Sequence, residues 1–199
     1  MRVLPYGDSA LLVETDDVLP LAEACRSGLD GLLDVVPAAR TVLLLAEPGT
    51  DLGGLRAAVE TLEVAAVEAA EVAAVEIPVV YDGPDLADVA ALTGLSEDEV
   101  VAAHTGTAWR VAFGGFAPGF AYLAGGDPRL SVSRRETSRT KVPAGSVGLA
   151  GEYSGVYPRS SPGGWQLLGR TDVVLFDLDR DPPALLQPGA EVRFVARDS

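Results

Sequence analysis

Cysteine and histidine are nearly absent from this sequence of 199 residues, which contains one of each, Cys25 and His104. A single thiol cannot form a disulfide within the chain, and this fits a protein of a reducing compartment. A structural zinc site needs four ligands, usually thiolates and imidazoles, and the sequence cannot supply them. We therefore expect neither a disulfide nor a metal site.

Long apolar runs are also missing. No stretch of the sequence approaches the roughly 18 consecutive apolar residues that a membrane span requires. Pro5, Gly7 and Asp8 lie close behind Met1, where a signal peptide would carry its apolar core. The sequence therefore predicts a cytoplasmic protein that has no membrane partner.

Positive charge is scarce in the first half of the chain. Residues 1–109 contain four arginines and 20 acidic residues, whereas residues 110–199 contain 11 basic and 9 acidic residues. A surface this acidic repels nucleic acid and anionic lipid, so we expect neither as a partner. Ordinary solubilising charge explains the acidity equally simply, and we favour that interpretation.

The first part of the chain predicts a small α+β layer. Residues 10–13 and 41–46 are short apolar runs typical of strands, and residues 18–29 between them have a helical pattern. Residues 52–70 are rich in alanine, glutamate, leucine and valine, which favour a further helix. We expect this helix to cover the sheet.

The composition changes near Val75, where β-branched residues replace the alanine-rich segment. Pro78 within the new run indicates an edge strand or the start of another element. We therefore predict two domains, residues 1–75 and residues 76–199.

Helices are expected at the start of the second domain. Asp85 can cap one helix, and Ser96 with Glu99 forms the capping-box pattern of a second helix that continues to His104. After Trp109, glycine, proline and serine interrupt short apolar runs every few residues. This texture is typical of a β-barrel or a β-sandwich.

Residues 113–123 combine three glycines and a proline with aromatic residues. Glycine lets a backbone pass close to another group, and Phe116, Phe120 and Tyr122 can then form the walls of an apolar pocket. A tight barrel corner filled with core aromatics would produce the same pattern. The segment alone leaves both interpretations open.

A basic run, residues 134–141, stands out from the acidic remainder of the chain. If its second half is extended, Arg139 and Lys141 share one face, because side chains of a strand alternate. Paired cations on one face suit a carboxylate or a phosphate. The alternative is a solvated face that pairs with the acidic half or with a partner subunit.

Four motifs follow one another in the second domain and resemble a known family. They read G-F-A-P-G-F-A-Y-L, D-P-R-L, R-T-K-V-P-A-G-S-V and Y-P-R-S-S-P-G-G-W-Q-L-L-G-R-T, and they begin at residues 115, 127, 139 and 157. On these motifs the chain resembles the KipI-like family, which includes the B subunit of bacterial 5-oxoprolinase. The resemblance extends from about Ile77 to Phe176 and is looser before that segment.

The resemblance implies a fold and a function. The fold is α+β, with a small N-terminal α+β domain followed by a cyclophilin-like β-barrel. The function is that of one component of an ATP-dependent 5-oxoprolinase, which opens 5-oxoproline to glutamate together with a KipA-like C subunit, and with a separate A subunit. The family is also described as allophanate hydrolase subunit 1, and one branch inhibits a sensor histidine kinase, so both remain alternatives.

The candidate site follows from these motifs. We expect Arg134, Arg139 and Lys141 to bind a small-molecule carboxylate, beside polar neighbours and aromatic walls. The polar neighbours are His104, Tyr157 and Gln166, and the walls are Phe116 and Phe120. Arg139, Lys141 and His104 are the candidate catalytic residues. Histidine near the end of a helix also often just complements the helix dipole, which is the alternative for His104.

Nucleotide chemistry is not expected in this chain. It contains no G-x-x-x-x-G-K-[ST] loop for ATP and no G-x-S-x-G nucleophile elbow. We therefore expect the chain to bind no cofactor and the complex to use ATP through another subunit.

The basic run departs from the family pattern at two positions. Ser133 and Ser138 stand where the family usually has proline, and the arginine after each of them is kept. Loss of two prolines should loosen the local backbone without changing its charge.

Overall fold

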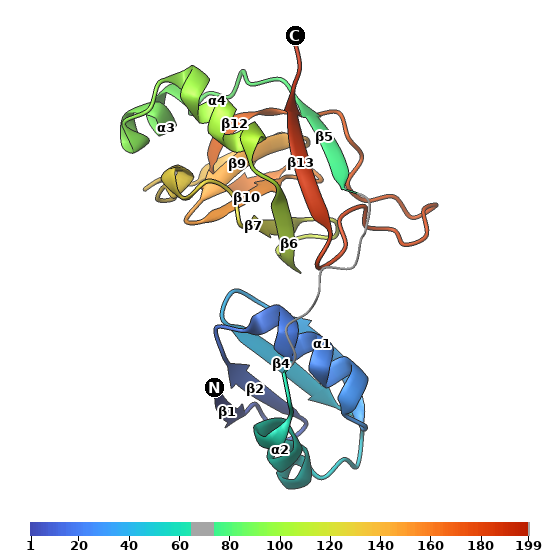
Figure 1. Ribbon diagram of the computed structural model, residues 1–199. Coiled ribbons are helices and arrows are strands. Elements are labelled where there is room, and N and C mark those ends of the chain that lie inside the picture. Colours follow the sequence, from blue (N-terminus) through green and yellow to red (C-terminus); the bar gives the residue numbers. More distant parts are fainter. Residues whose placement is uncertain (65–73, 199) are drawn as a thin grey trace. The chain divides into compact units, whose positions relative to one another are not determined.

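The computed structural model describes residues 1–64 and 74–198, and the chain divides into two compact units, Met1–Ala70 and Glu71–Ser199 (Figure 1). The predicted boundary at Val75 coincides with the first residue of a strand of the second unit. The helix expected over residues 52–70 ends at Thr61, and the remainder of that expectation lies largely outside the described residues. Every helix within the described residues is too short or too polar to cross a bilayer.

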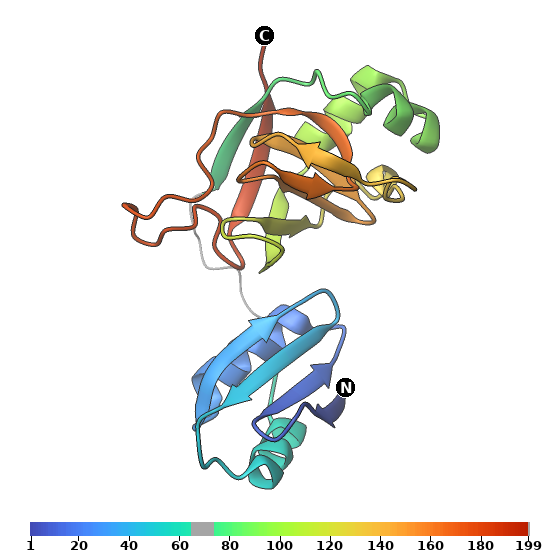
Figure 2. The same cartoon turned by 180° about the vertical axis from the view of Figure 1, so that it is seen from behind.

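The first unit is an antiparallel sheet covered by two helices on one face (Figure 2). Its strands in spatial order are β1 (Arg2–Pro5), β2 (Ala10–Glu14), β4 (Thr41–Ala46) and β3 (Leu32–Pro37), and its helices are α1 (Val18–Gly28) and α2 (Leu52–Thr61). Side chains of β4 alternate between buried and partly buried, so Val42 and Leu44 face the helices. Cys25 of α1 is fully buried in this core, and burial raises its pKa to about 11, so the thiol is inert.

The second unit is built on a seven-stranded sheet that curls into a barrel. Its strands in spatial order are β12 (Gln166–Arg170), β9 (Ser146–Ala150), β10 (Tyr153–Val156), β7 (Ala121–Ala124), β6 (Trp109–Gly114), β13 (Glu191–Ala196) and β5 (Val75–Val79). A separate pair, β8 (Arg139–Val142) and β11 (Ser161–Gly163), lies beside it. β5 is parallel to β13, and the remaining pairs are antiparallel.

The two edges of the seven-stranded sheet meet, which nearly closes the barrel. Val80, directly after β5, exchanges two backbone hydrogen bonds of 2.9 Å with Arg170 at the end of β12. The two backbone segments approach so closely here that a Cβ at Gly169 would overlap the Val80 carbonyl. Glycine is therefore required at the closure.

Two helices lie against the barrel, α3 (Leu86–Thr93) and α4 (Glu97–Gly106), and a 3₁₀ turn, η1 (Pro128–Leu130), follows β7. The capping box predicted at Ser96 and Glu99 is present, with both reciprocal hydrogen bonds. Of the two alternatives for the second domain, the barrel is confirmed. The predicted α+β fold class is also confirmed.

Candidate functional site

A cavity of about 230 Å³ lies at one side of the barrel and is walled mainly by aromatic rings. Its lining comes from β7, the basic run and the segment that enters β12, which are the motifs singled out in the sequence. The lining residues are Phe116, Phe120, Tyr122, Arg134, Ser138, Tyr157, Pro162, Gly163 and Trp165. The structure therefore brings four of the predicted site residues together, namely Arg134, Phe116, Phe120 and Tyr157.

The aromatic walls of the cavity support one another. Phe120 lies edge to face against Phe116, Tyr157 and Trp165, with ring centroids 5.3, 5.5 and 5.3 Å apart. Edge-to-face contacts of this kind stabilise rings beyond the area they bury. The floor is narrow, because a Cβ at Gly163 would overlap the Tyr157 ring. The cavity is thus a rigid apolar surface that suits a small flat ligand.

Phe116 holds an unusual backbone conformation at the edge of this cavity. Its φ is +64°, and it is the non-glycine residue with positive φ within the described residues. This region costs an ordinary side chain roughly 1–2 kcal/mol. Phe116 is nevertheless 58% exposed, so burial of its ring offsets little of this cost. Strain retained without packing is typical of functional positions.

Arg134 places a guanidinium group on the cavity. Its side chain makes no hydrogen bond or ion pair within residues 1–64 and 74–198. It lies near Tyr157, whose pKa is raised by burial and lowered in part by a backbone hydrogen bond with Trp165 and by the Arg134 charge. A free guanidinium beside apolar walls can bind a carboxylate through two parallel hydrogen bonds.

Arg139 is engaged elsewhere. Its Nη2 donates to the buried Oδ1 of Asp85 at 2.6 Å, and Nη1 of Arg135 donates to the same oxygen at 2.6 Å. The backbone N–H of Leu167 donates to Oδ2 of Asp85 at 2.7 Å. Asp85 therefore fastens the basic run and β12 to the start of α3. Asp85 occupies the predicted N-cap position of α3, but its side chain makes no capping hydrogen bond.

His104 lies in the barrel core, and its side chain is not part of the cavity. Its Nδ1 is hydrogen-bonded to the Tyr81 hydroxyl at 2.7 Å, and its Nε2 to the Ser154 hydroxyl at 2.8 Å. The imidazole is fully buried and stacks on Phe194 at a centroid distance of 4.2 Å. Burial lowers its pKa to about 3, so the ring is neutral and both nitrogens are satisfied.

Gln166 and Lys141 also lie apart from the cavity lining. Gln166 is buried, and its Nε2 donates to the Ser133 carbonyl at 3.2 Å. It faces a second, open hollow beside α3 and the basic run. Lys141 is exposed on β8, although it is only two residues from Arg139. The extended conformation expected here is present, since both residues lie in β8, but Arg139 is paired with Asp85 whereas Lys141 is exposed.

The structure adds Ser138 and Trp165 to the residues expected at the cavity, and Tyr122 lines it as expected. Tyr122 had been expected to form a pocket wall, while Trp165 had no site role in the sequence. The glycine pair before Trp165 was the available signal. A Cβ at Gly164 would overlap the Ser138 hydroxyl, so this pair brings Trp165 and the basic run together.

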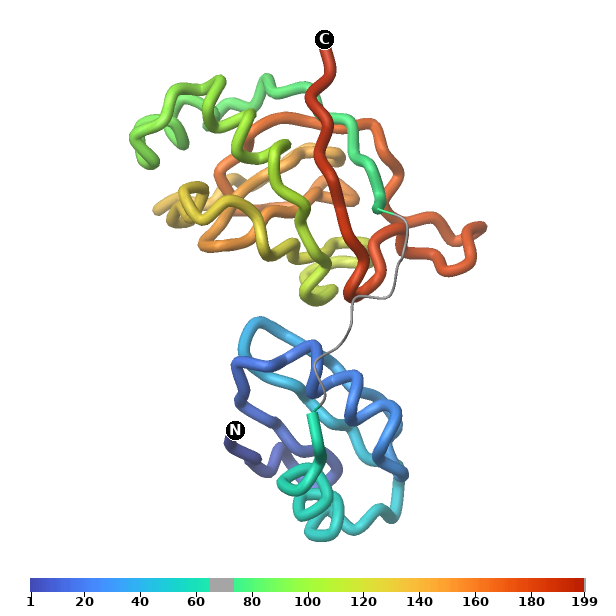
Figure 3. The backbone as a smooth tube through the Cα atoms, viewed as in Figure 1, coloured from blue at the N-terminus to red at the C-terminus, as the bar shows by residue number. Residues whose placement is uncertain are grey.

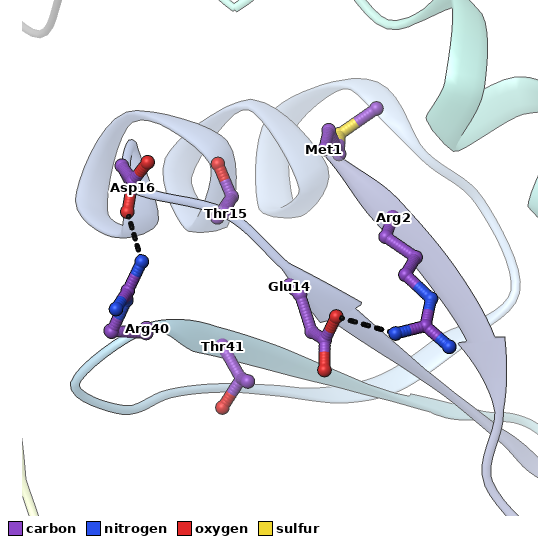
Figure 4. Close-up of a pocket in the computed structure, with 7 residues that line it drawn as sticks. All are labelled: Met1, Arg2, Glu14, Thr15, Asp16, Arg40 and Thr41. Atoms are coloured by element: carbon purple, nitrogen blue, oxygen red, sulfur yellow. Dashed lines mark hydrogen bonds and ion pairs between the residues drawn. The ribbon is translucent and has the colours of Figure 1, made fainter.

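Another hollow, of about 540 Å³, lies on the first unit (Figure 4). Its charged side chains pair with one another: Arg2 with Glu14 at 3.4 Å and Arg40 with Asp16 at 3.1 Å. These pairs are exposed and screened by solvent. The hollow is larger than the aromatic cavity, but its charges are already neutralised.

Comparison with known proteins identifies the family. Residues 1–186 match the family described as carboxyltransferase domain, subdomain C and D. The chain belongs to this family. Among curated proteins, the B subunit of 5-oxoprolinase from Escherichia coli O157:H7 is 40% identical over 98% of this chain and 95% of its own length. The expected resemblance to the B subunit of 5-oxoprolinase is confirmed.

Two further relatives are similar over a smaller share of their length. The B subunit of 5-oxoprolinase from Bacillus subtilis (strain 168) is 49% identical over 67% of this chain and 57% of its own. The crystal structure of TTHA0988 superposes with a TM-score of 0.80 and 39% identity over 96% of this chain. This chain covers only 40% of the TTHA0988 chain.

Proposed function

We propose that this chain is the non-ATP-binding subunit of a cytoplasmic complex that hydrolyses 5-oxoproline to glutamate. The partners in this proposal are a KipA-like C subunit, and an A subunit that uses ATP. The names of the curated relatives support the assignment. The observation that carries it is the guanidinium group of Arg134, which has no partner among the described residues and lies on an aromatic cavity of small-molecule size.

The proposed ligand has the two features that this cavity accommodates. 5-Oxoproline carries one carboxylate, which Arg134 can bind, and a flat five-membered lactam, which can lie against Phe116, Phe120 and Trp165. Hydrolysis adds water to the lactam carbonyl and breaks its C–N bond, which yields a second carboxylate and an amine. This chain would hold the lactam in position and keep bulk water away from it.

The groups that activate the reaction would come from the partners. His104 is sealed in the core, and burial raises the pKa of Tyr157, so neither suits a general base at neutral pH. Ser138 lies in the cavity but has no base beside it among the residues that line the cavity. In the proposed complex this chain therefore binds and orients the substrate.

Allophanate is the second candidate substrate. An alignment of 74 positions, which covers 34% of this chain, is 38% identical to urea amidolyase of Saccharomyces cerevisiae. Allophanate combines a carboxylate with a flat amide, so the Arg134 cavity would accept it by the same contacts.

The test is a reconstitution of the complex from this chain and the products of its neighbouring genes. We expect ATP-dependent release of glutamate from 5-oxoproline by the full mixture and its loss when this chain is omitted. Release that persists without this chain would refute the proposal. ATP-dependent turnover of allophanate, with none of 5-oxoproline, would select the second candidate. Failure of both substrates with an assembled complex would favour a kinase-inhibitor role.

A further inference from the structure

Residues 172–186, which we call the arm, project from the barrel between β12 and β13 (Figures 1 and 3). The arm folds back on itself as a short hairpin. The backbone N–H of Leu185 donates to the Leu175 carbonyl at 2.9 Å, and that of Asp177 donates to the Pro183 carbonyl at 3.0 Å. A bridge between Phe176 and Ala184 lies between these two bonds. The hairpin is thus an ordered element of the second unit.

One face of the arm is apolar and exposed. Val174, Phe176 and Leu178 are 57%, 36% and 80% exposed, whereas Leu175 between them is buried. Val174 and Phe176 lie two residues apart in the extended half of the hairpin, where alternate side chains point to the same side, and Leu178 lies in the turn at the tip, so the three form an exposed apolar cluster. Isolated apolar residues are common on surfaces, but a cluster of them on a projecting element is typical of a protein interface.

The arm is also acidic. Asp172, Asp177, Asp179 and Asp181 contribute four carboxylates. The one basic side chain, Arg180, is engaged, since its Nη2 donates to the Val174 carbonyl at 3.0 Å. An apolar cluster on an acidic hairpin is complementary to an apolar groove bordered by lysine and arginine.

The base of the arm touches the loop that carries Phe116. Gly119 of that loop packs so closely against Leu175 and Phe176 that a Cβ there would overlap Phe176. A protein bound to the arm would therefore hold the loop at the edge of the aromatic cavity.

The lengths of the relatives bear on which partner the arm would bind. In TTHA0988, the region similar to this chain takes up 40% of a longer polypeptide, so the same module is continuous with further protein there. The family description likewise names only subdomains C and D of a larger domain. We propose that the arm is the docking element for a separate polypeptide. This polypeptide would correspond to the remainder of the TTHA0988 chain and would present an apolar groove bordered by basic side chains.

The proposal relies on the proposed function only in naming that polypeptide as the KipA-like subunit. Its test is direct binding, which requires no substrate. The full chain and the KipA-like protein are titrated by biolayer interferometry, with wild-type and Leu178→Asp chains. Because a charge would enter the apolar groove, we expect Leu178→Asp to raise Kd at least about tenfold. Leu33→Asp, a change of a 68% exposed leucine of β3, is the matched control and should leave Kd unchanged.

The aspartate side chains of the arm allow a second measurement. Asp179→Asn with Asp181→Asn should raise Kd by about threefold at low salt and flatten its dependence on salt. Unchanged Kd for Leu178→Asp would overturn the proposal, and so would an equal loss in Leu33→Asp. Self-association of the chain alone that Leu178→Asp abolishes would also overturn it, because the arm would then bind a second copy. A complex that binds through the arm but does not turn over 5-oxoproline would contradict only the proposed function.

Discussion

His104 and Arg134 both lie among aromatic rings of the second unit, yet their surroundings differ. Both nitrogens of His104 have hydrogen-bond partners, and the ring is completely buried. Arg134 is exposed on the cavity, and its guanidinium has no partner within the described residues. Aromatic neighbours therefore do not distinguish a site from a core. The distinguishing feature is whether the polar atoms remain free to bind something else.

The contrast has a physical basis. A buried polar group that loses its partner costs about 1–3 kcal/mol, so core groups such as His104 are satisfied inside the protein. An exposed cation such as Arg134 is satisfied by water, which a ligand can displace. Arg139 is an intermediate case, since its Nη2 is bound to the buried Asp85, whereas its Nη1 is buried without a hydrogen-bond partner among the described residues.

Arg134→Ala tests whether the exposed guanidinium group binds substrate. Charge-assisted hydrogen bonds contribute about 1.5–3 kcal/mol, so kcat/KM of the reconstituted complex should fall roughly 10- to 100-fold. The melting temperature should stay unchanged, because Arg134 has no partner to lose within the described residues. Arg134→Lys keeps the positive charge but cannot make two parallel hydrogen bonds to a carboxylate. Its kcat/KM should therefore lie between those of the wild type and Arg134→Ala. Both quantities are measured on the same preparations.

Arg193→Ala is the control for this prediction. Arg193 is an exposed arginine of β13 that pairs with Glu191 at 2.8 Å, and it lies outside the cavity lining. Its removal should not change kcat/KM. Full activity of Arg134→Ala, or a comparable loss in Arg193→Ala, would remove Arg134 from the site.

The pH dependence of stability tests whether His104 is buried and neutral. Burial lowers the pKa of His104 from 6.5 to about 3, so the folded protein keeps the ring neutral where the unfolded chain takes up a proton. This contribution is fully present above pH 6.5 and is lost as pH falls towards 3. Between pH 6.5 and pH 5, the free energy of unfolding should decrease by about 2 kcal/mol. Urea denaturation at several pH values measures it.

His104→Gln isolates this effect, because His104 is the one histidine of the chain. The variant should be less stable at every pH, since glutamine cannot reproduce both hydrogen bonds and the stacking on Phe194. Its stability should change little between pH 6.5 and pH 5. An equally steep change in the variant would assign the titration to carboxylates and would contradict a buried neutral His104.

The same contrast explains what the sequence predicted and what it missed. Short-range signals succeeded: Ser96 and Glu99 form their capping box three residues apart, and the glycine-rich segment does bring Phe116 and Phe120 to a cavity. Long-range partners could not be predicted. Asp85 is 54 residues from Arg139, so the two-residue strand period alone suggested a shared face with Lys141.

His104 illustrates the same limit. Its helix was predicted correctly, but the partners of its ring come from distant segments, 23 residues away at Tyr81 and 50 residues away at Ser154. The two roles predicted for His104, catalysis and interaction with the helix dipole, were both inferred without knowledge of these partners. Whether a polar side chain is satisfied depends on tertiary pairing, which local patterns do not encode.

Phe116 provides the smallest and most specific test, because it is the strained residue of the open region. Both Phe116→Ala and Phe116→Gly remove the ring, but alanine keeps the cost of a positive φ and glycine does not. Relief of strain outweighs the extra entropy of unfolded glycine, so the glycine variant should be more stable than the alanine variant by roughly 0.5–1 kcal/mol. Chemical denaturation compares the two directly.

Activity distinguishes strain kept for function from strain that is incidental. If the Phe116 ring forms a wall of the substrate site, both variants should lose kcat/KM by a similar factor of roughly three to ten, since they lack the same contacts. Equal stability of the two variants would show that the backbone at residue 116 is not strained. Wild-type activity in both would show that the exposed ring does not contact substrate, and the open region would then depend on Arg134 and the buried aromatic rings alone.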